Sequence, residues 1–360
     1  MPESDYSPLY VLTRGETVES IHYGSAAVVT ADGKLIAWYG NPDAVAFLRS
    51  TAKPFQALPF LEYGGEAYYG LSAQEIAITC ASHTGSDQHL RVVSRYQKMV
   101  GVSESELLCG AHMPSDVSSA RALRERNELP TPNYNNCSGK HTGMLAYAKM
   151  MAANGDLLPQ DMPYIDFSHP VQASIRKTVA EICGLAEQEI KLGIDGCSAP
   201  NFAIPLQNTA LGFARLCDPE LGGVQPQARV AACRQVTRAM QEYPVLVRGP
   251  GRFDSALMET GKGRLISKGG AEGYYGIGLL PGVLRPSSPG VGIAIKISDG
   301  DLEDRAGSAV ALDILTQLGV LSADDLSNMA QFGPIRPVYN WRKIVVGQGR
   351  PAFSLRFAGE

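Results

Sequence analysis

The sequence predicts a mixed α/β (α+β) protein, in which a mostly antiparallel sheet lobe is built from both chain ends and a helical lobe is inserted between them. Strand patterns near the N-terminus return in the last third of the chain, while capped helix patterns fill the middle. The late strands are joined by links of roughly four to a dozen residues, which suit antiparallel neighbours. We therefore expect one domain over residues 1–360, with the sheet lobe at approximately 1–70 and 245–360 and the helical lobe at approximately 71–244.

The first predicted element is a β-hairpin over residues 26–40. Its sequence, AAVVTADGKLIAWYG, places two apolar runs around an Asp-Gly pair, which is a strong signal for a tight hairpin turn. Two capping-box spacings follow, in which a serine and a glutamate three residues later satisfy N–H groups at a helix start. These spacings are Ser72 with Glu75 and Ser103 with Glu106.

Longer helices are predicted from apolar periodicity and from their end signals. In SHPVQASIRKTVAEICG we expect Ser168 to cap the helix, Pro170 to lie in its first turn and Gly184 to follow its end. The other predicted helices and the late strands are, in chain order, helices in 141–155 and 227–244, strands in 263–270, 273–280 and 290–300, a helix in 305–319 and a strand in 341–347.

Composition limits the partners of the chain. The formal net charge of −4 provides no basic surface for nucleic acid or anionic membrane, so the expected partner is a small molecule or a protein. We find no signal-peptide pattern and no apolar run of about 18 residues that could span a bilayer. Seven scattered cysteines without an export signal favour reduced thiols and a cytoplasmic location.

The segment 48-LRSTAKPFQ-56 combines a serine and a lysine on one helical turn. A serine hydroxyl needs a base to become a nucleophile, and a lysine can act as that base once burial or nearby cations lower its pKa. Ser50 and Lys53 are therefore a candidate catalytic pair, and Arg49 could bind a substrate carboxylate. The alternative is a capping serine beside two solvated cations, which the spacing alone does not exclude.

Two further polar loops carry candidate residues. The first, TCASHTGSDQH, places Ser82 and His83 after an apolar helix, either as cleft-lining groups or as an ordinary helix end before the next cap. The second, SKGGAEGYYGIG, places Lys268 before two glycines, where a ligand could approach the backbone closely. An ordinary turn with an exposed lysine is the alternative.

Cysteines in two separate loops suggest a metal site. NYNNCSGKHTG contains Cys137 and Lys140, and GIDGCSAPNFAIP contains Asp195 and Cys197. Thiolates are natural zinc ligands, so these loops could share one zinc ion, although the paired C-x-x-C spacing is absent. The alternative is two buried thiols that act as small apolar residues.

Together these segments resemble the thermolabile L-asparaginase II family, the Rhizobium etli-type or class 3 asparaginases, over nearly the whole chain. The motifs that carry the resemblance are, in order, RSTAKPFQALP, CASHTGSDQH, YNNCSGKHTGML, GIDGCSAPNFAIPL and SKGGAEG. The resemblance implies a single asparaginase II-type domain with a fold similar to serine β-lactamases and glutaminases. It also implies a homodimer.

The resemblance assigns a role to each candidate residue. Ser50 with Lys53 matches the family's first Ser-Lys pair, and Ser82 with Lys268 matches the second. The residues matching one zinc site per chain are Cys137, Lys140 and Cys197. The residues placed with the substrate are Arg49, Asp195 and His83. No organic cofactor is expected.

The activity implied is hydrolysis of L-asparagine to L-aspartate and ammonia through a serine acyl-enzyme. Either Ser50 or Ser82 could attack first, with Ser50 expected. The alternatives are a glutaminase or broader ω-amidase, and a non-catalytic zinc-dependent amino-acid sensor. Penicillin-recognising enzymes carry S-D-N and K-T-G signatures, whereas this chain has Ser82-His83-Thr84 and Lys268-Gly269-Gly270, which argues against β-lactam chemistry.

Overall fold

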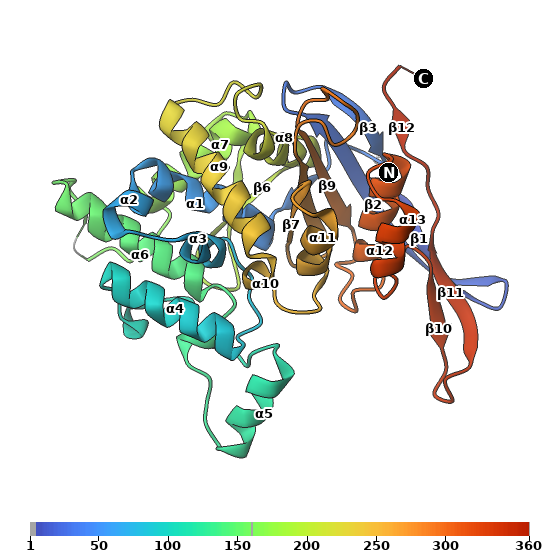
Figure 1. The fold of residues 1–360 in the computed structure, drawn as a ribbon, viewed down its shortest axis with the longest axis horizontal. Helices are drawn as coiled ribbons and strands as arrows, with labels where there is room; N and C mark the ends of the chain where they lie inside the picture. The colour runs from blue at the N-terminus through green and yellow to red at the C-terminus, as the bar shows by residue number, and fades with distance from the viewer. Residues whose placement is uncertain (1–4, 160, 360) are drawn as a thin grey trace. The chain divides into compact units, whose positions relative to one another are not determined.

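The computed structural model describes residues 5–159 and 161–359 and divides them into two compact units (Figure 1). The first, called here the sheet unit, contains the chain up to Thr51, Ala203–Gly223 and the chain from Ala256. The second, called here the helical unit, contains Ala52–Phe202 and Val224–Ser255. The single-domain assignment and the lobe boundaries of the sequence analysis stay predictions.

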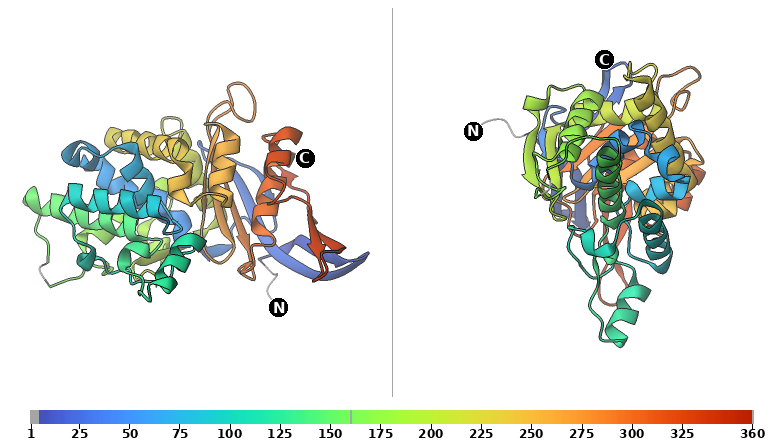
Figure 2. Two further views of the ribbon diagram at one scale, coloured as in Figure 1. Left: turned by 60° about the horizontal axis from the view of Figure 1, so that its bottom comes forward. Right: turned by 90° about the vertical axis from the view of Figure 1, so that its left-hand side faces the viewer.

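The sheet unit is built on a nine-stranded sheet in the order β10-β11-β1-β2-β9-β8-β7, with β3 paired to β2 and β12 paired to β3. The described strands of this sheet pair antiparallel throughout, which confirms the mixed α/β class with a mostly antiparallel sheet. Figure 2 shows β10 and β11, in red, at one edge of it. The strands are β1 Ser7–Arg14, β2 Thr17–Thr30, β3 Leu35–Tyr39, β7 Leu265–Gly269, β8 Tyr274–Leu279, β9 Val291–Ile297, β10 Arg336–Tyr339, β11 Val345–Pro351 and β12 Arg356–Phe357.

Helices cover both faces of the central strands. On β8, a Cβ atom at Gly276 would lie 2.2 Å from the Phe213 ring of helix α8 (Leu206–Cys217). The neighbouring Tyr275 packs against Gly307 at the start of helix α12 (Gly307–Gln317). Because successive side chains point to opposite faces of a strand, α8 and α12 cover opposite faces. This explains why β7, β8 and β9 are buried along nearly their whole length.

The predicted N-terminal hairpin is confirmed. Strands β2 and β3 pair with Val29 opposite Leu35, and the Thr30 N–H donates to the Lys34 carbonyl at 3.0 Å across the turn. Gly33 has a φ of 89°, in the left-handed region that glycine adopts without strain. The Asp-Gly pair therefore marks the turn, as its sequence predicted.

The helical unit is arranged around helix α1 (Lys53–Glu62), which is buried along most of its length and contacts α6, α7 and α9. A Cβ atom at Gly139 of α6 would lie 2.2 Å from the Ile78 carbonyl oxygen of α3, so glycine permits these two helices to approach closely. The helices are α2 Gly65–Tyr69, α3 Ala73–Thr79, α4 Asp87–Val100, α5 Val117–Glu125, α6 Ser138–Ala153, α7 Pro170–Cys183, α9 Gln227–Glu242 and α10 Pro244–Val247.

The remaining elements complete the description. Helix α11 (Phe253–Gly261) precedes β7, and α13 (Ala323–Asn328) precedes β10. Strand β4 (Val45–Phe47) pairs antiparallel with the second half of β6 (Pro200–Pro205), and β5 (Lys191–Ile194) precedes β6. In the part of the chain that the structure describes, no helix has the length and apolar character needed to cross a bilayer.

Helix ends largely follow the predicted signals, with one correction. The capping box of Ser72 and Glu75 opens α3, and Gly184 ends α7 with a φ of 69°. The cap of α7, however, is His169 and not Ser168. The His169 side chain accepts a hydrogen bond from the Val171 N–H at 3.2 Å. An imidazole nitrogen therefore caps the first turn of α7, where the sequence had predicted the serine hydroxyl.

Candidate active site

The predicted nucleophile Ser50 lies in a short 3₁₀ turn, Arg49–Ala52, directly before α1. Arg49 has a φ of 51°, a left-handed conformation that a non-glycine residue rarely adopts and that is frequent at functional sites. Its guanidinium lies 3.7 Å from the Glu272 carboxylate within the sheet unit. Ser50 is half-buried. The turn thus holds Arg49 in a strained conformation directly before Ser50.

Lys268 lies beside this turn in the sheet unit. A Cβ atom at Gly270 would come within 2.7 Å of the Leu48 carbonyl and 2.8 Å of the Thr51 hydroxyl, so only glycine permits this approach. The Thr51 hydroxyl in turn donates to the Lys268 carbonyl at 3.2 Å. The Lys268 side chain is fully buried, and its Nζ donates to the Gly269 carbonyl at 2.5 Å. The sheet unit therefore brings the Ser50 turn next to Lys268.

Lys53 is the first residue of α1 and is almost completely buried in the helical unit. Its Nζ donates to the Ala81 carbonyl at 2.5 Å, the Ser82 hydroxyl at 3.0 Å and the Asn136 carbonyl at 3.2 Å. Burial lowers the pKa of Lys53, and the nearby Lys140 cation acts in the same direction, although the thiols of the site oppose it. The fold thus places a desolvated amine on a serine hydroxyl.

The serine that Lys53 contacts is Ser82, which the sequence analysis had paired with Lys268. Ser82 follows α3, and its backbone is anchored by its N–H to the Val247 carbonyl at 2.8 Å and by Arg248 Nη1 on its own carbonyl at 3.3 Å. The pairings of Ser50 with Lys53 and of Ser82 with Lys268 stay predictions. The contact between Lys53 and Ser82 is an addition that spacing did not indicate.

His83 is buried beside Ser82 and holds a defined tautomer. The Gly85 N–H donates to its Nδ1 at 3.2 Å, so the proton lies on Nε2, which donates to the Ser138 hydroxyl at 2.9 Å. Burial lowers the pKa of His83 well below 6.5, and the stacked ring of His89, 5.1 Å away between centroids, lowers it further. His83 is therefore neutral and ties the Ser82 loop to helix α6. Its predicted contact with substrate stays a prediction.

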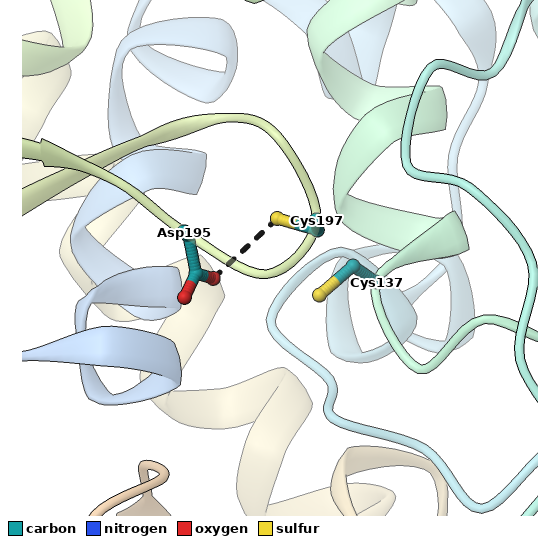
Figure 3. A group of neighbouring side chains, drawn as sticks. All are labelled: Cys137, Asp195 and Cys197. Atoms are coloured by element: carbon teal, nitrogen blue, oxygen red, sulfur yellow. Dashed lines mark hydrogen bonds between the residues drawn. The ribbon is translucent and has the colours of Figure 1, made fainter.

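The two loops that were predicted to bind a metal ion lie side by side in the helical unit. The sulfur atoms of Cys137 and Cys197 and a carboxylate oxygen of Asp195 all lie within 4.8 Å of one another (Figure 3). Cys137 stands at the N-terminal cap of α6, while Asp195 and Cys197 lie in the loop between β5 and β6. The Cys197 thiol donates to Asp195 Oδ2 at 3.4 Å, and Lys140 Nζ donates to the Cys197 sulfur at 3.0 Å. Both cysteines are buried.

The two cysteines share a proton unequally. The hydrogen bond from Cys197 lowers the pKa of Cys137 well below 9, aided by the cations of Lys53 and Lys140 and against the effect of burial. The same bond, together with burial, raises the pKa of Cys197 to about 11. Burial lowers the pKa of Lys140, but the two sulfurs and Asp195 outweigh it and raise that pKa. Of the two thiols, Cys137 is therefore the one that loses its proton more readily.

This donor set fits zinc. Two cysteine sulfurs with a carboxylate oxygen in reach are ligands that zinc accepts, and the lowered pKa of Cys137 supplies the first thiolate. Asp195 was predicted beside the substrate and also lies in ligand range. Lys140 would have to lose its proton to bind a metal. The positive charge of a metal ion bound by the two sulfurs would favour that loss. The assignment of Lys140 as a ligand stays a prediction.

One residue of this cluster was given no role from the sequence. His141 is buried, and its Nδ1 lies 2.7 Å from the Tyr164 hydroxyl, which accepts the Leu108 N–H at 2.8 Å. Burial lowers the pKa of His141 to about 4, and the interaction with Cys197 acts in the opposite direction. Its Nε2 is buried without a well-formed hydrogen bond to any described residue. Its position directly after Lys140 in SGKHTG was the only sequence signal.

These groups define a class of chemistry. A buried amine on a serine hydroxyl, beside a neutral histidine, is an arrangement that can activate the hydroxyl as a nucleophile or proton relay. Residues 10–351 match the model of the family described as L-asparaginase II. The chain belongs to the L-asparaginase II family, which confirms the resemblance and makes the protein an amidohydrolase.

Solved structures similar to the chain include two glutaminases. One is described as a probable glutaminase from Bacillus subtilis complexed with 6-diazo-5-oxo-L-norleucine, at 12% identity and a TM-score of 0.38, covering 82% of this chain and 84% of that one. The other is a Bacillus glutaminase at 13% identity and a TM-score of 0.38, covering 82% and 91%. None of the curated proteins compared with the chain matches it.

Proposed function

We propose that the protein hydrolyses L-asparagine to L-aspartate and ammonia through a serine acyl-enzyme. The observation that carries this proposal is the 3.0 Å hydrogen bond between the buried Lys53 amine and the Ser82 hydroxyl, in a chain of the L-asparaginase II family. A glutaminase or broader ω-amidase uses the same bond chemistry and is separated only by its substrate.

In the proposed reaction, Ser50 Oγ attacks the side-chain amide carbon and forms a tetrahedral oxyanion. Lys53 takes the serine proton, and the hydrogen bond to Ser82 carries a proton on toward the leaving nitrogen, with Lys268 as the partner of Ser82. The C–N bond breaks, ammonia leaves and an aspartyl ester remains on the serine. Water then cleaves the ester and restores the hydroxyl. The Lys53 contact equally supports the alternative in which Ser82 attacks.

Three residues are proposed to bind the substrate. Arg49 suits the α-carboxylate, because a guanidinium binds carboxylates with two parallel hydrogen bonds. Asp195 suits the α-ammonium. His83 is proposed as the third substrate contact, and its hydrogen bond to Ser138 also holds the Ser82 loop in place.

One zinc ion per chain is proposed in the cluster of Cys137 and Cys197, with Lys140 and Asp195 as further candidate ligands. When bound, zinc would neutralise the sulfur charge and tie the Asp195 loop to the start of α6. The chain's own residues carry every proton transfer described above. A cytoplasmic location is also proposed, supported by seven cysteines that are not joined in disulfides. A homodimer is proposed from the family resemblance alone.

The proposal is tested by ammonia release from L-asparagine and L-glutamine for the wild type, Ser50→Ala and Ser82→Ala. We expect asparagine turnover by the wild type and a loss of at least about 10²-fold in either variant, since a positioned proton-transfer group alone contributes about 10²–10⁴-fold and a nucleophile contributes more. Mass spectrometry of acid-quenched samples should show the ester on Ser50. An ester on Ser82 would reverse the two roles. Faster glutamine turnover would replace asparaginase by glutaminase, and no turnover would favour a binding protein.

A further inference from the structure

His141 lies beside the cluster of Cys137, Cys197 and Asp195 but has no part in the proposed reaction. It belongs to helix α6, one residue after Lys140, and its side chain is fully buried. Its Nε2 atom makes no complete hydrogen bond with the described residues. A buried polar atom left unpaired costs about 1–3 kcal/mol, so such atoms are rare unless a partner satisfies them in the working protein.

Tyr164 determines which ring nitrogen of His141 carries the proton. The Tyr164 oxygen accepts the Leu108 N–H at 2.8 Å and lies 2.7 Å from His141 Nδ1. Burial raises the pKa of Tyr164, so the hydroxyl keeps its hydrogen. In the described part of the chain, that hydrogen has Nδ1 as its acceptor and no other. Nδ1 is therefore unprotonated, and the proton of the ring lies on Nε2.

The Cys197 sulfur is the group with which this N–H interacts. Burial is the main influence on the pKa of His141 and lowers it, and the interaction with Cys197 acts against that effect. The sulfur has two further partners. Lys140 Nζ donates to it at 3.0 Å, and its own thiol hydrogen is donated to Asp195 Oδ2 at 3.4 Å. His141 is thus a second N–H group directed at one sulfur.

Metal binding would change the other two contacts of this sulfur. A Cys197 thiolate has no hydrogen to donate to Asp195, and Lys140 donates to the sulfur only while it keeps its own proton. The His141 N–H depends on neither change, because Tyr164 holds the ring in its tautomer. Hydrogen bonds to the ligands of a metal orient them and stabilise their charge.

We propose that His141 is a positioning residue of the zinc site, in which its Nε2–H donates to the Cys197 thiolate and Tyr164 fixes the tautomer that permits this. His141 is therefore not a further zinc ligand, because a protonated Nε2 has no lone pair for a metal. The inference rests on the proposed zinc ion and is independent of which serine attacks.

Nitrogen NMR of the zinc-loaded wild type, with isotope-labelled histidine, tests the tautomer without altering the site. The His141 ring should show a protonated Nε2 and an unprotonated Nδ1. Its signals are assigned by their loss in His141→Gln or His141→Leu. A proton on Nδ1, or an Nε2 bound to the metal, would overturn the proposal.

Zinc affinity and a cobalt spectrum separate the hydrogen bond from simple packing. His141→Leu removes the N–H, so chelator competition should give a zinc dissociation constant about 10–100-fold higher than that of the wild type. In the cobalt-substituted variant, the sulfur-to-cobalt charge-transfer band should move to lower energy, because the sulfur electrons lose a stabilising donor. His141→Gln keeps an N–H and should restore most of both properties. A His141→Leu band at the wild-type energy would overturn the proposal, whatever its zinc affinity.

Tyr164→Phe keeps the histidine and removes the hydroxyl that fixes its tautomer, so zinc should bind several-fold more weakly. The matched control is Tyr96→Phe, which removes a buried hydroxyl bonded to Thr79 in the same unit and should bind zinc as the wild type does. Equal zinc affinity in the two variants would contradict the role of Tyr164 and overturn the proposal. A wild type that binds neither zinc nor cobalt would overturn this inference together with the zinc site, whereas asparagine turnover reports separately on the hydrolysis.

Discussion

Lys53 is held by two backbone carbonyls and the Ser82 hydroxyl, so its amine is both desolvated and aimed at a reactive group. We predict that Lys53→Met, which keeps the volume and removes the amine, lowers asparagine turnover by about 10²–10⁴-fold. Steady-state ammonia release measures this. The matched control is Lys149→Met, a half-exposed lysine on α6 paired with Glu106, which should leave turnover unchanged. Activity of Lys53→Met within tenfold of the wild type would exclude Lys53 as the base.

The sulfur cluster makes a prediction that does not depend on activity. Cys137→Ser and Cys197→Ser each remove one of two sulfurs that lie in ligand range, so zinc content should fall from one ion per chain to well below that value. Elemental analysis of the purified proteins measures it. Cys183→Ser changes a buried thiol of α7 outside the cluster and should keep its zinc. A wild type without zinc, or serine variants that retain it, would contradict the assignment.

At the scale of elements, the active-site loops depend on close helix packing. The start of α6, which carries Cys137 and Lys140, lies against the end of α3, which leads into Ser82. Gly139→Ala would place a Cβ atom 2.2 Å from the Ile78 carbonyl, and backbone cannot yield as a flexible side chain can. We expect a loss of about 1–3 kcal/mol in unfolding free energy, measured by urea denaturation. Ala152→Ser, exposed on the same helix, should change it by less than about 0.5 kcal/mol.

Helix α7 allows the capping correction to be tested directly. His169→Ala removes the side chain that accepts the Val171 N–H and should cost about 0.5–2 kcal/mol of stability. Ser168→Ala removes the exposed hydroxyl of the neighbouring residue and should be nearly neutral. Urea denaturation of both variants compares them. The reverse order of costs would return the cap to Ser168.

At the scale of the whole molecule, stability should depend on pH through the stacked pair His83 and His89. Burial lowers the pKa of both rings in the fold, and for His83 the other ring and Lys53 act in the same direction, while Asp116 opposes the shift at His89. Since the folded pKa values lie below the ordinary 6.5, the unfolded chain binds protons first as pH falls. The stabilising contribution is therefore complete above about pH 6.5 and is lost progressively below it.

Unfolding free energies measured between pH 7.5 and pH 5 test this dependence. His89→Gln removes one of the two titrating rings, so its stability should fall less steeply with acid than that of the wild type. An equal slope for the two proteins would show that other groups control the acid response.

Local features were predictable because their causes lie within a few residues. The Asp32-Gly33 turn and the Ser72–Glu75 capping box each act over one to four positions, and both formed as expected. The Ser168 cap failed because two neighbouring side chains could reach the same N–H groups, and sequence did not show which one would. The candidate residues themselves came from motif resemblance rather than from periodicity.

By itself, the sequence determined the family, the mixed α/β class with its antiparallel sheet, and most helix starts, since each depends on motifs or patterns of short range. Only the tertiary structure decided that Lys53 contacts Ser82, that Asp195 lies beside two sulfurs, and that His141 belongs to their cluster. These contacts join residues from 2 positions apart, as with Asp195 and Cys197, to 58 positions apart, as with Cys137 and Asp195, and they are set by how helices and loops pack. The spacing of residues along the chain does not predict how these helices and loops pack.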